Sequence, residues 1–305
     1  MADPLTLEVP ESLEGARVDK AIATLLGVSR ATARALLDEG VTIDGQPARP
    51  GDRVGPGSHI LTPAPTPTPD LQPEEVTFPV LFEDEMVLVI DKPPGITVHP
   101  GSGRQTGTLA AGLLHRYPEL EGVGDPGRWG LVHRLDRETS GTLIVARTTF
   151  SYARLSADIA ARHIDRHYTA LARNRFPVPT GTIDAPIGPD PSLPTRRAVV
   201  ATGKPSVTHY EVVEELVDGE VSVLAVRLET GRTHQIRAHL AAIDHPILGD
   251  RSYSSTRSRF NAPRVMLHAR SVAFDHPGSG ERTVVEAPLP EDMRTVLDEL
   301  RGASS

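Results

Sequence analysis

The amino-acid sequence predicts an α+β fold in two parts that are joined by a proline-rich linker. Segments typical of strands and helices follow one another without a regular βαβ alternation, which favours a curved mixed sheet. Residues 63–73 carry five prolines, a composition that keeps a chain extended and stiff. The 305 residues are enough for two domains. We therefore expect a small domain over residues 1–62, a linker over 63–75 and a larger domain over 76–305.

The composition is typical of a soluble globular protein, with 38% hydrophobic and 24% charged residues. The first fifteen residues show neither the basic start nor the apolar stretch of a signal peptide, and no run is long enough to cross a bilayer. The chain has no cysteine, which excludes disulfides and thiolate metal sites and fits a reducing compartment. We expect a cytoplasmic protein.

The net charge of −8 argues mildly against a nucleic-acid partner, but the charge is unevenly distributed. Residues 162–175 hold four arginines and one aspartate, and residues 251–264 hold four arginines and no acid. Such local patches decide whether a phosphate backbone is attracted. The alternative for each patch is an ordinary solvated surface.

The first part of the chain predicts two short helices followed by a hairpin. Apolar residues over 17–26 recur at helical spacing, and a second helix is expected from Ser29, a good N-cap, to Gly40. Residues 41–43 and the Asp44-Gly45 turn then begin a hairpin. Arg30 and Arg34 fall one turn apart on the second helix, where they would meet RNA phosphates or serve as a solubilising face.

Beyond Val76 the pattern changes to short strands with a few helices. The Pro-Pro-Gly after Lys92 predicts a fixed loop, suited to lining a cleft. The expected strands are 80–82, 86–90, 142–146, 167–172 and 221–228, and the expected helices are 109–114, 152–162 and 233–242.

Residues 130–147, GLVHRLDRETSGTLIVAR, place one acid, Asp136, among His133, Arg134 and Arg137. Neighbouring positive charge favours the charged form of a carboxylate, and a charged aspartate is a serviceable nucleophile. The competing interpretation is a turn in which an Asp136 oxygen accepts the backbone N–H of residue 138 or 139. Spacing alone does not decide between these two.

No motif for a cofactor or metal is evident. The chain lacks a P-loop, a G-x-G-x-x-G and an H-E-x-x-H motif. His234 and His239 are five residues apart, so on a helix they would point to different faces and make a poor metal pair. We expect neither a cofactor nor a metal.

Several motifs together resemble one family. His-Arg-Leu-Asp, two variable residues and Thr-Ser-Gly before a strand resemble the catalytic motif of the RluA family of pseudouridine synthases. Further matching stretches follow the family order: DKPPGITVHP at 91–100, RHYTAL at 166–171, GTIDAPIG at 181–188, and ETGRTHQIRAHL at 229–240, which continues into HPILGD at 245–250. The resemblance implies a mainly antiparallel sheet over roughly residues 76–290. The N-terminal part resembles the S4 RNA-binding module.

The resemblance also implies roles for individual residues. Asp136 would be the nucleophile, and Tyr168 would stack on the target base and help to remove the C5 proton. Arg237 would pair with Asp136, with Arg232 of the same motif as the competing candidate. Arg134 would enter the RNA stack when the uridine is flipped out, because the reacting atoms are inaccessible inside a helix.

The predicted function is the isomerisation of uridine to pseudouridine, which requires no redox change. The S4-like module favours large-subunit ribosomal RNA or a pre-ribosomal particle as partner, and we expect a monomer that does not bind membranes. A tRNA substrate is an alternative that the motifs do not distinguish. A non-catalytic RNA-binding ribosome-assembly factor could lose Asp136 freely, and an aspartate-nucleophile glycosidase would need a second carboxylate, for which Glu138 is the nearby candidate.

Overall fold

The computed structural model describes residues 4–28, 30–65, 71–100, 106–125, 127–193, 195–254 and 259–303. The chain divides into two compact units. The first comprises Met1–Pro73 and Glu121–Trp129, and the second comprises Glu74–Leu120 and Gly130–Ser305. Residues 63–65 and 71–73 of the expected linker lie in neither strand nor helix, and residues 66–70 lie outside the described residues.

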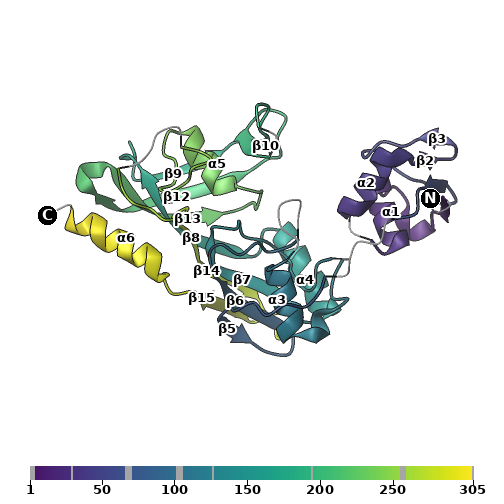
Figure 1. The fold of residues 1–305 in the computed structure, drawn as a ribbon, viewed down its shortest axis with the longest axis horizontal. Coiled ribbons are helices and arrows are strands. Elements are labelled where there is room, and N and C mark those ends of the chain that lie inside the picture. Colours follow the sequence, from purple (N-terminus) through teal and green to yellow (C-terminus); the bar gives the residue numbers. More distant parts are fainter. Residues whose placement is uncertain are drawn as a thin grey trace. The chain divides into compact units, whose positions relative to one another are not determined.

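The first unit packs two helices on a small antiparallel sheet (Figure 1). The elements are β1 (Leu5–Glu8), η1 (Glu11–Leu13), α1 (Val18–Leu26), α2 (Arg30–Gly40), β2 (Thr42–Ile43), β3 (Gln46–Pro47) and β4 (His59–Thr62). The sheet order is β1-β4-β2-β3, so β1 and β4 extend the hairpin predicted from the sequence into four strands. Apolar side chains from both helices and the sheet, including Ile22, Leu36 and Ile60, form one buried cluster.

Local sequence signals account for much of this unit. Ile43 pairs with Gln46 across the Asp44-Gly45 turn, and both turn residues have positive φ, as a two-residue hairpin turn requires. Helix α1 ends at Gly27, whose φ of 64° is the left-handed conformation that glycine adopts without strain. Ser29, the expected N-cap of α2, lies outside the described residues.

The second unit is built on a nine-stranded mixed sheet. Its strands are β5 (Val80–Glu83), β6 (Val87–Lys92), β7 (Ser140–Ala146), β8 (Asp165–Arg173), β9 (Thr180–Asp184), β12 (Val207–Leu216), β13 (Val221–Leu228), β14 (Leu267–Asp275) and β15 (Arg282–Glu286). The order is β5-β6-β7-β14-β8-β13-β12-β9, with β15 also on β14. Among the described strand pairs of this sheet only β7–β14 is parallel, so the sheet is mainly antiparallel as expected. A separate ribbon pairs β10 (Ile187–Pro189) with β11 (Arg197–Val199).

The helices of this unit are α3 (Leu109–Arg116), α4 (Thr149–Ala160), α5 (Gln235–Ala242) and α6 (Glu291–Gly302), with short 3-10 turns at η2 (Pro118–Leu120) and η3 (Val217–Gly219). The prediction of a helix over 152–162 was misplaced, because Thr148 and Ser151 form a capping box that starts α4 earlier. The predicted start of the 233–242 helix was also early, because His234 has a left-handed backbone and α5 begins after it.

Gly141 allows the parallel contact on which the site depends. Its φ is 112°, and a Cβ at this position would lie 2.2 Å from the carbonyl oxygen of Ala269 on β14. The two strands approach this closely only because residue 141 has no side chain. The loop that carries Asp136 leads directly into β7, so the close approach of Gly141 to Ala269 fixes the position of the loop relative to β14.

Candidate active site

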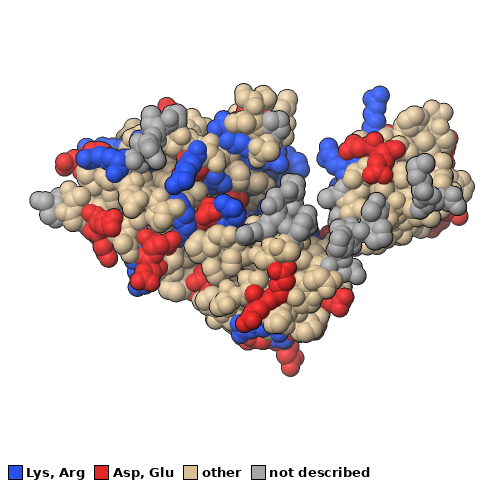
Figure 2. Space-filling model, in the orientation of Figure 1, with Lys and Arg blue, Asp and Glu red and all other residues tan. Residues whose placement is uncertain are grey.

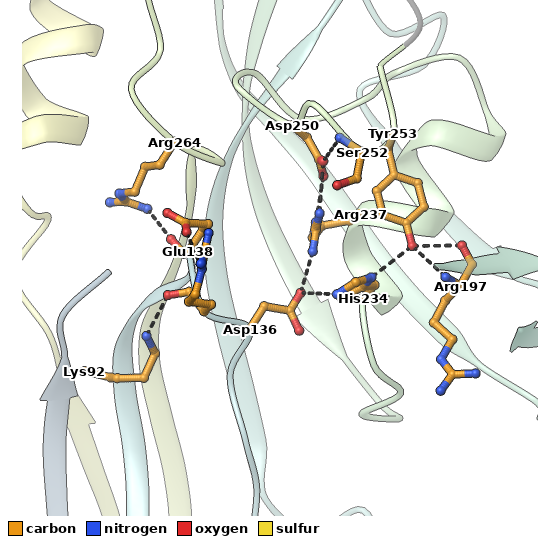
Figure 3. Close-up of polar contacts among 11 residues, drawn as sticks. Lys92, Asp136, Glu138, Arg197, His234, Arg237, Asp250, Ser252, Tyr253 and Arg264 are labelled. Atoms are coloured by element: carbon orange, nitrogen blue, oxygen red, sulfur yellow. Dashed lines mark hydrogen bonds and ion pairs between the residues drawn. The ribbon is translucent and has the colours of Figure 1, made fainter. Parts of the chain in front are cut away.

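Asp136 lies in the loop between Gly130 and β7, and its side chain is 17% exposed. The turn interpretation is only half right. The Thr139 amide donates to the backbone carbonyl of Asp136 at 3.1 Å, whereas the Asp136 carboxylate accepts a hydrogen bond from Arg237 (Figure 3). The side chain is therefore turned toward another element of the fold.

Arg237 on α5 connects two carboxylates. Its Nε and Nη2 donate to the two oxygens of Asp250 at 2.7 and 3.0 Å, and its Nη1 donates to Asp136 Oδ2 at 3.2 Å. Burial disfavours its charge, but the hydrogen bonds to Asp250 and the two negative charges more than offset this and raise the pKa of Arg237. Asp250 is fully buried and also accepts the amide of Ser252 at 3.0 Å. The three side chains form a fixed charged chain that ends at Asp136.

Two buried cations hold the backbone just after Asp136. Lys92 Nζ donates to the carbonyls of Pro93, Ile96 and Arg137 at 2.7, 3.0 and 3.1 Å. Burial, and second the charge of Arg264, lower the pKa of Lys92 to about 7.

Arg264 donates to the carbonyl of Glu138 at 3.0 Å and forms an ion pair with Asp292 on α6. Both cations thus bond carbonyls in the turn that follows Asp136 (Figure 3).

His234 approaches Asp136 from the start of α5. Its Nε2 lies 3.9 Å from Asp136 Oδ2, and its Nδ1 lies 3.1 Å from the hydroxyl of Tyr253. That hydroxyl donates to the carbonyl of Arg197 at 2.8 Å and accepts the Arg197 amide at 3.1 Å. Burial lowers the pKa of His234, and this effect exceeds that of the Asp136 charge, which raises the pKa.

Tyr168 lies on β8 and is 7% exposed. Among the described residues its hydroxyl has no hydrogen-bond partner. Burial raises the pKa of Tyr168. The positive charge of Arg166 lowers this pKa, and the negative charge of Asp136 raises it further. The charge of Asp136 therefore contributes to the electrostatic environment of the Tyr168 hydroxyl.

His133, three residues before Asp136, attaches the loop to strand β7. Its Nε2 accepts the amide of Ile144 on β7 at 2.9 Å. Burial, and second the charge of Arg166, lower the pKa of His133 to about 3, in keeping with an unprotonated Nε2 that accepts this bond. Within the His-Arg-Leu-Asp motif, His133 therefore has a structural role, which is to hold the loop against β7.

Among the described residues, the side-chain contacts of the Asp136 carboxylate are with Arg237 and His234, and the other predicted residues of the second unit are not among them. Arg134 and Arg232 are exposed, and Arg232 contacts the carbonyl of Pro205 at 3.5 Å. Of the two arginines in the 229–240 motif, Arg237 is the one in contact with Asp136. Arg30 and Arg34 belong to the first unit. Arg34 is exposed, and Arg30 forms an ion pair of 2.9 Å with Asp19.

The sequence did not single out Lys92, Asp250 or Tyr253 as site residues, and it considered His234 only as a metal ligand. Two signals were present, since Lys92 and Asp250 end apolar stretches within motifs already recognised. A charged side chain that is buried at the end of a strand or turn needs a polar or charged partner, so such a residue is a candidate for a site.

Over the described ranges, no three side chains of His, Asp or Glu are grouped to hold a metal ion. No helix in those ranges is long and apolar enough to span a membrane.

Comparison with known proteins finds relatives along most of the chain. The model of the RNA pseudouridylate synthase family matches residues 86–242. The chain is 40% identical to a protein of Nitrosomonas europaea named ribosomal large subunit pseudouridine synthase D, over 97% of this chain and 88% of that protein. It is 42% identical to an uncharacterized RNA pseudouridine synthase of Chloroflexus aurantiacus, over 100% of this chain and 96% of that protein.

Solved structures agree as well. The fold matches the structure of human RNA pseudouridylate synthase domain containing 1 with a TM-score of 0.57 and 25% identity, over 75% of this chain and 97% of that one. The family match covers β6 to α5, the segments that carry Lys92, Asp136, Tyr168 and Arg237. The chain belongs to the RNA pseudouridylate synthase family and is an RNA pseudouridine synthase, an isomerase.

Proposed function

We propose that this enzyme isomerises specific uridines of large-subunit ribosomal RNA, with Asp136 as the nucleophile. The substrate is supported by the name of the Nitrosomonas relative, which aligns along almost the whole chain. The observation that carries the assignment of Asp136 is its hydrogen bond to Arg237, which is itself anchored by Asp250. A carboxylate aimed by a fixed guanidinium needs little reorganisation to attack.

Tyr168 and Arg134 serve the base that reacts. Tyr168 stacks on the flipped uracil, since it lies on β8, the charge of Asp136 contributes to its raised pKa, and its hydroxyl is not committed to another described residue. Arg134 is exposed two residues before Asp136, where it fills the gap that the flipped nucleotide leaves in the RNA stack.

The phosphate backbone is held by cations around the site and by the first unit. Figure 2 shows basic side chains gathered over the part of the second unit that carries α5 and β10. Exposed Arg232 lies just before α5 in the sequence. In the first unit Arg34 is exposed, and Arg30 keeps a 57% exposed side chain while it pairs with Asp19. These arginines bind phosphates and add affinity without sequence information.

The test maps pseudouridine by sequencing total RNA from three strains of the source cell: with the protein, without it, and with only the Asp136→Asn variant. We expect sites in large-subunit ribosomal RNA that are present in the first strain and lost in the other two. Asp275→Asn is the matched control, because this carboxylate is half-exposed on β14 and pairs with Arg282.

Two results would contradict the proposal in different ways. Loss of sites in tRNA alone would move the substrate to tRNA. Full modification by Asp136→Asn would remove the nucleophile assignment while leaving the ribosomal substrate intact.

A further inference from the structure

The protonation pattern around Tyr253 fixes the tautomer of His234. The Tyr253 hydroxyl has one proton, and a backbone carbonyl, that of Arg197, can only accept it. The hydroxyl oxygen also accepts the Arg197 amide at 3.1 Å. His234 Nδ1, at 3.1 Å from the same oxygen, must therefore donate, so the ring proton of neutral His234 is on Nδ1.

The other ring nitrogen, Nε2, is then an unprotonated acceptor that faces the reacting carboxylate. It lies 3.9 Å from Asp136 Oδ2, too far for a direct hydrogen bond. It has no hydrogen-bond partner within the described part of the chain, and the His234 side chain is 23% exposed. Figure 3 shows the imidazole between Tyr253 and Asp136, with one nitrogen turned to each.

We propose that His234 Nε2 is the base that removes the C5 proton of the uridine in the last chemical step. The inference rests on the proposed role of Asp136, because it places the reacting sugar carbon beside that carboxylate. When the base has rejoined the sugar through C5, C5 is one bond from C1′. A base at His234 then lies within reach of the hydrogen on C5.

The step balances without any oxidant or cofactor. The C5–H bond breaks, and its electron pair forms the C5=C6 double bond. The N1=C6 electron pair moves onto N1, which takes up a proton from solvent. The proton from C5 goes to Nε2 and then to solvent, so that one proton has moved in net terms from C5 to N1.

The other groups beside Asp136 are poorer acceptors. Burial raises the pKa of Tyr168, so its hydroxyl keeps its proton. Arg237 is a protonated guanidinium committed to two carboxylates. A carboxylate such as Asp136 is an intrinsically weaker base than imidazole, and its Oδ2 already accepts from Arg237. His234 alone combines a free lone pair with a neutral ring that a neighbouring hydroxyl orients.

The experiment is single-turnover kinetics on an RNA that the wild-type enzyme converts, with either hydrogen or deuterium at C5 of the target uridine. His234→Gln and His234→Asn place an amide near Nε2 or near Nδ1, and neither supplies a base. His163→Gln is the matched control, because this histidine side chain is 65% exposed. RNA affinity and melting temperature are measured for every variant.

We expect both His234 variants to slow the reaction about 100-fold, the scale of a lost general base. Because C5 deprotonation then limits the rate, they should show a larger C5 isotope effect than the wild type. Wild-type rates in both variants, or a slower reaction with an unchanged isotope effect, would overturn the proposal and leave His234 a structural residue. Asp136→Asn in the same assay keeps the two proposals separate, since its activity reports only on the nucleophile.

Discussion

Asp250 accepts two hydrogen bonds from Arg237, which leaves a single guanidinium nitrogen, Nη1, to contact Asp136 at 3.2 Å. The stronger attachment is thus to the carboxylate that is fully buried, and the weaker one is to the carboxylate that reaches solvent. Arg237 is anchored on one side and directs Asp136 on the other. We therefore expect Asp250 to influence the reaction through Arg237, although it does not contact Asp136.

Asp250→Asn tests this indirect influence. The amide cannot accept two hydrogen bonds from Arg237 as a carboxylate does, so we expect Arg237 to reorient and turnover to fall at least tenfold, with RNA affinity unchanged. The loss of a buried charge-assisted bond should also reduce the free energy of unfolding by about 2 kcal/mol. Single-turnover rates, RNA titration and denaturant unfolding measure the three quantities. Equal rates for Asp250→Asn and the wild type would mean that Asp136 needs no fixed partner.

Arg237→Lys separates charge from geometry. A lysine ammonium keeps the positive charge but lacks the planar guanidinium that gives Asp250 two hydrogen bonds while a third nitrogen contacts Asp136. We expect a large loss of turnover at saturating RNA. Arg232→Lys is the matched change in the same motif, and we expect it to retain turnover with somewhat weaker binding, because Arg232 is exposed. The reverse pattern, with Arg232→Lys inactive and Arg237→Lys active, would exchange the two roles.

Lys92→Met replaces a buried lysine with an uncharged side chain of similar length and so removes the ammonium group. The carbonyls of Pro93 and Ile96 would lose the Lys92 donor, whereas that of Arg137, next to Asp136, would keep the Gly95 amide at 2.8 Å. Each buried acceptor left unpaired costs about 1–3 kcal/mol, so we expect the free energy of unfolding to fall by about 3 kcal/mol. Lys204→Met is the control, since Lys204 is exposed. Equal denaturation midpoints for the two variants would show that the Lys92 bonds contribute little.

The stability of the protein should fall in mildly acidic solution because of His268. This side chain is fully buried between Ser140 and the carbonyl of Ala287, and burial lowers its pKa to about 4. An unfolded histidine has a pKa of about 6.5. As the pH falls from about 6.5 towards 4, the unfolded chain binds a proton that the folded chain does not, so folding stability is lost.

The measurement compares denaturant unfolding of the wild type and His268→Gln at pH 7.5 and pH 5. The slope from this one histidine is at most about 1.4 kcal/mol per pH unit. We expect the variant to be the less stable protein at pH 7.5 and the difference to narrow at pH 5. A difference that is the same at both pH values would mean that His268 titrates alike in the folded and unfolded chains.

A truncated protein that starts at Gln72 tests the division of labour between the units. It keeps Glu74, whose amide donates to Ala111 and whose carboxylate accepts the Gly107 amide at 2.8 Å. We expect it to isomerise uridine at high RNA concentration, with weaker binding and a shallower salt dependence. Each lost phosphate contact should reduce the log–log salt slope by about one.

Single-turnover kinetics at several salt concentrations measure the activity and the salt slope of the full-length and truncated proteins. Residues 121–129 group with the first unit, so the melting temperature of the truncated protein must be measured beside its activity. An unchanged salt slope would mean that the first unit does not hold RNA. A folded but inactive truncation at saturating RNA would mean that the first unit helps to build the active site.

Local signals in the sequence were sufficient for several elements and for the family. The Asp44-Gly45 turn, helix α1 and the apolar strand β7 depend on residues close together in the chain, and each was predicted. The ordered motifs predicted the pseudouridine synthase fold and activity, which the family match confirms. The sequence did not indicate β12, β14, β15 or α6, whose patterns of burial depend on distant neighbours.

The sequence by itself determined which residue types stand in the motifs, whereas the tertiary structure decided which of them meet. It could not choose between Arg232 and Arg237, because five residues of spacing within one motif say nothing about a carboxylate 101 residues away. It also gave Asp250 and Tyr253 no role, because their partners come from other segments. Folding β7 beside β14 and placing α5 against this sheet brings these groups within hydrogen-bonding distance. Long-range packing, rather than local propensity, is the physical reason that the site exists.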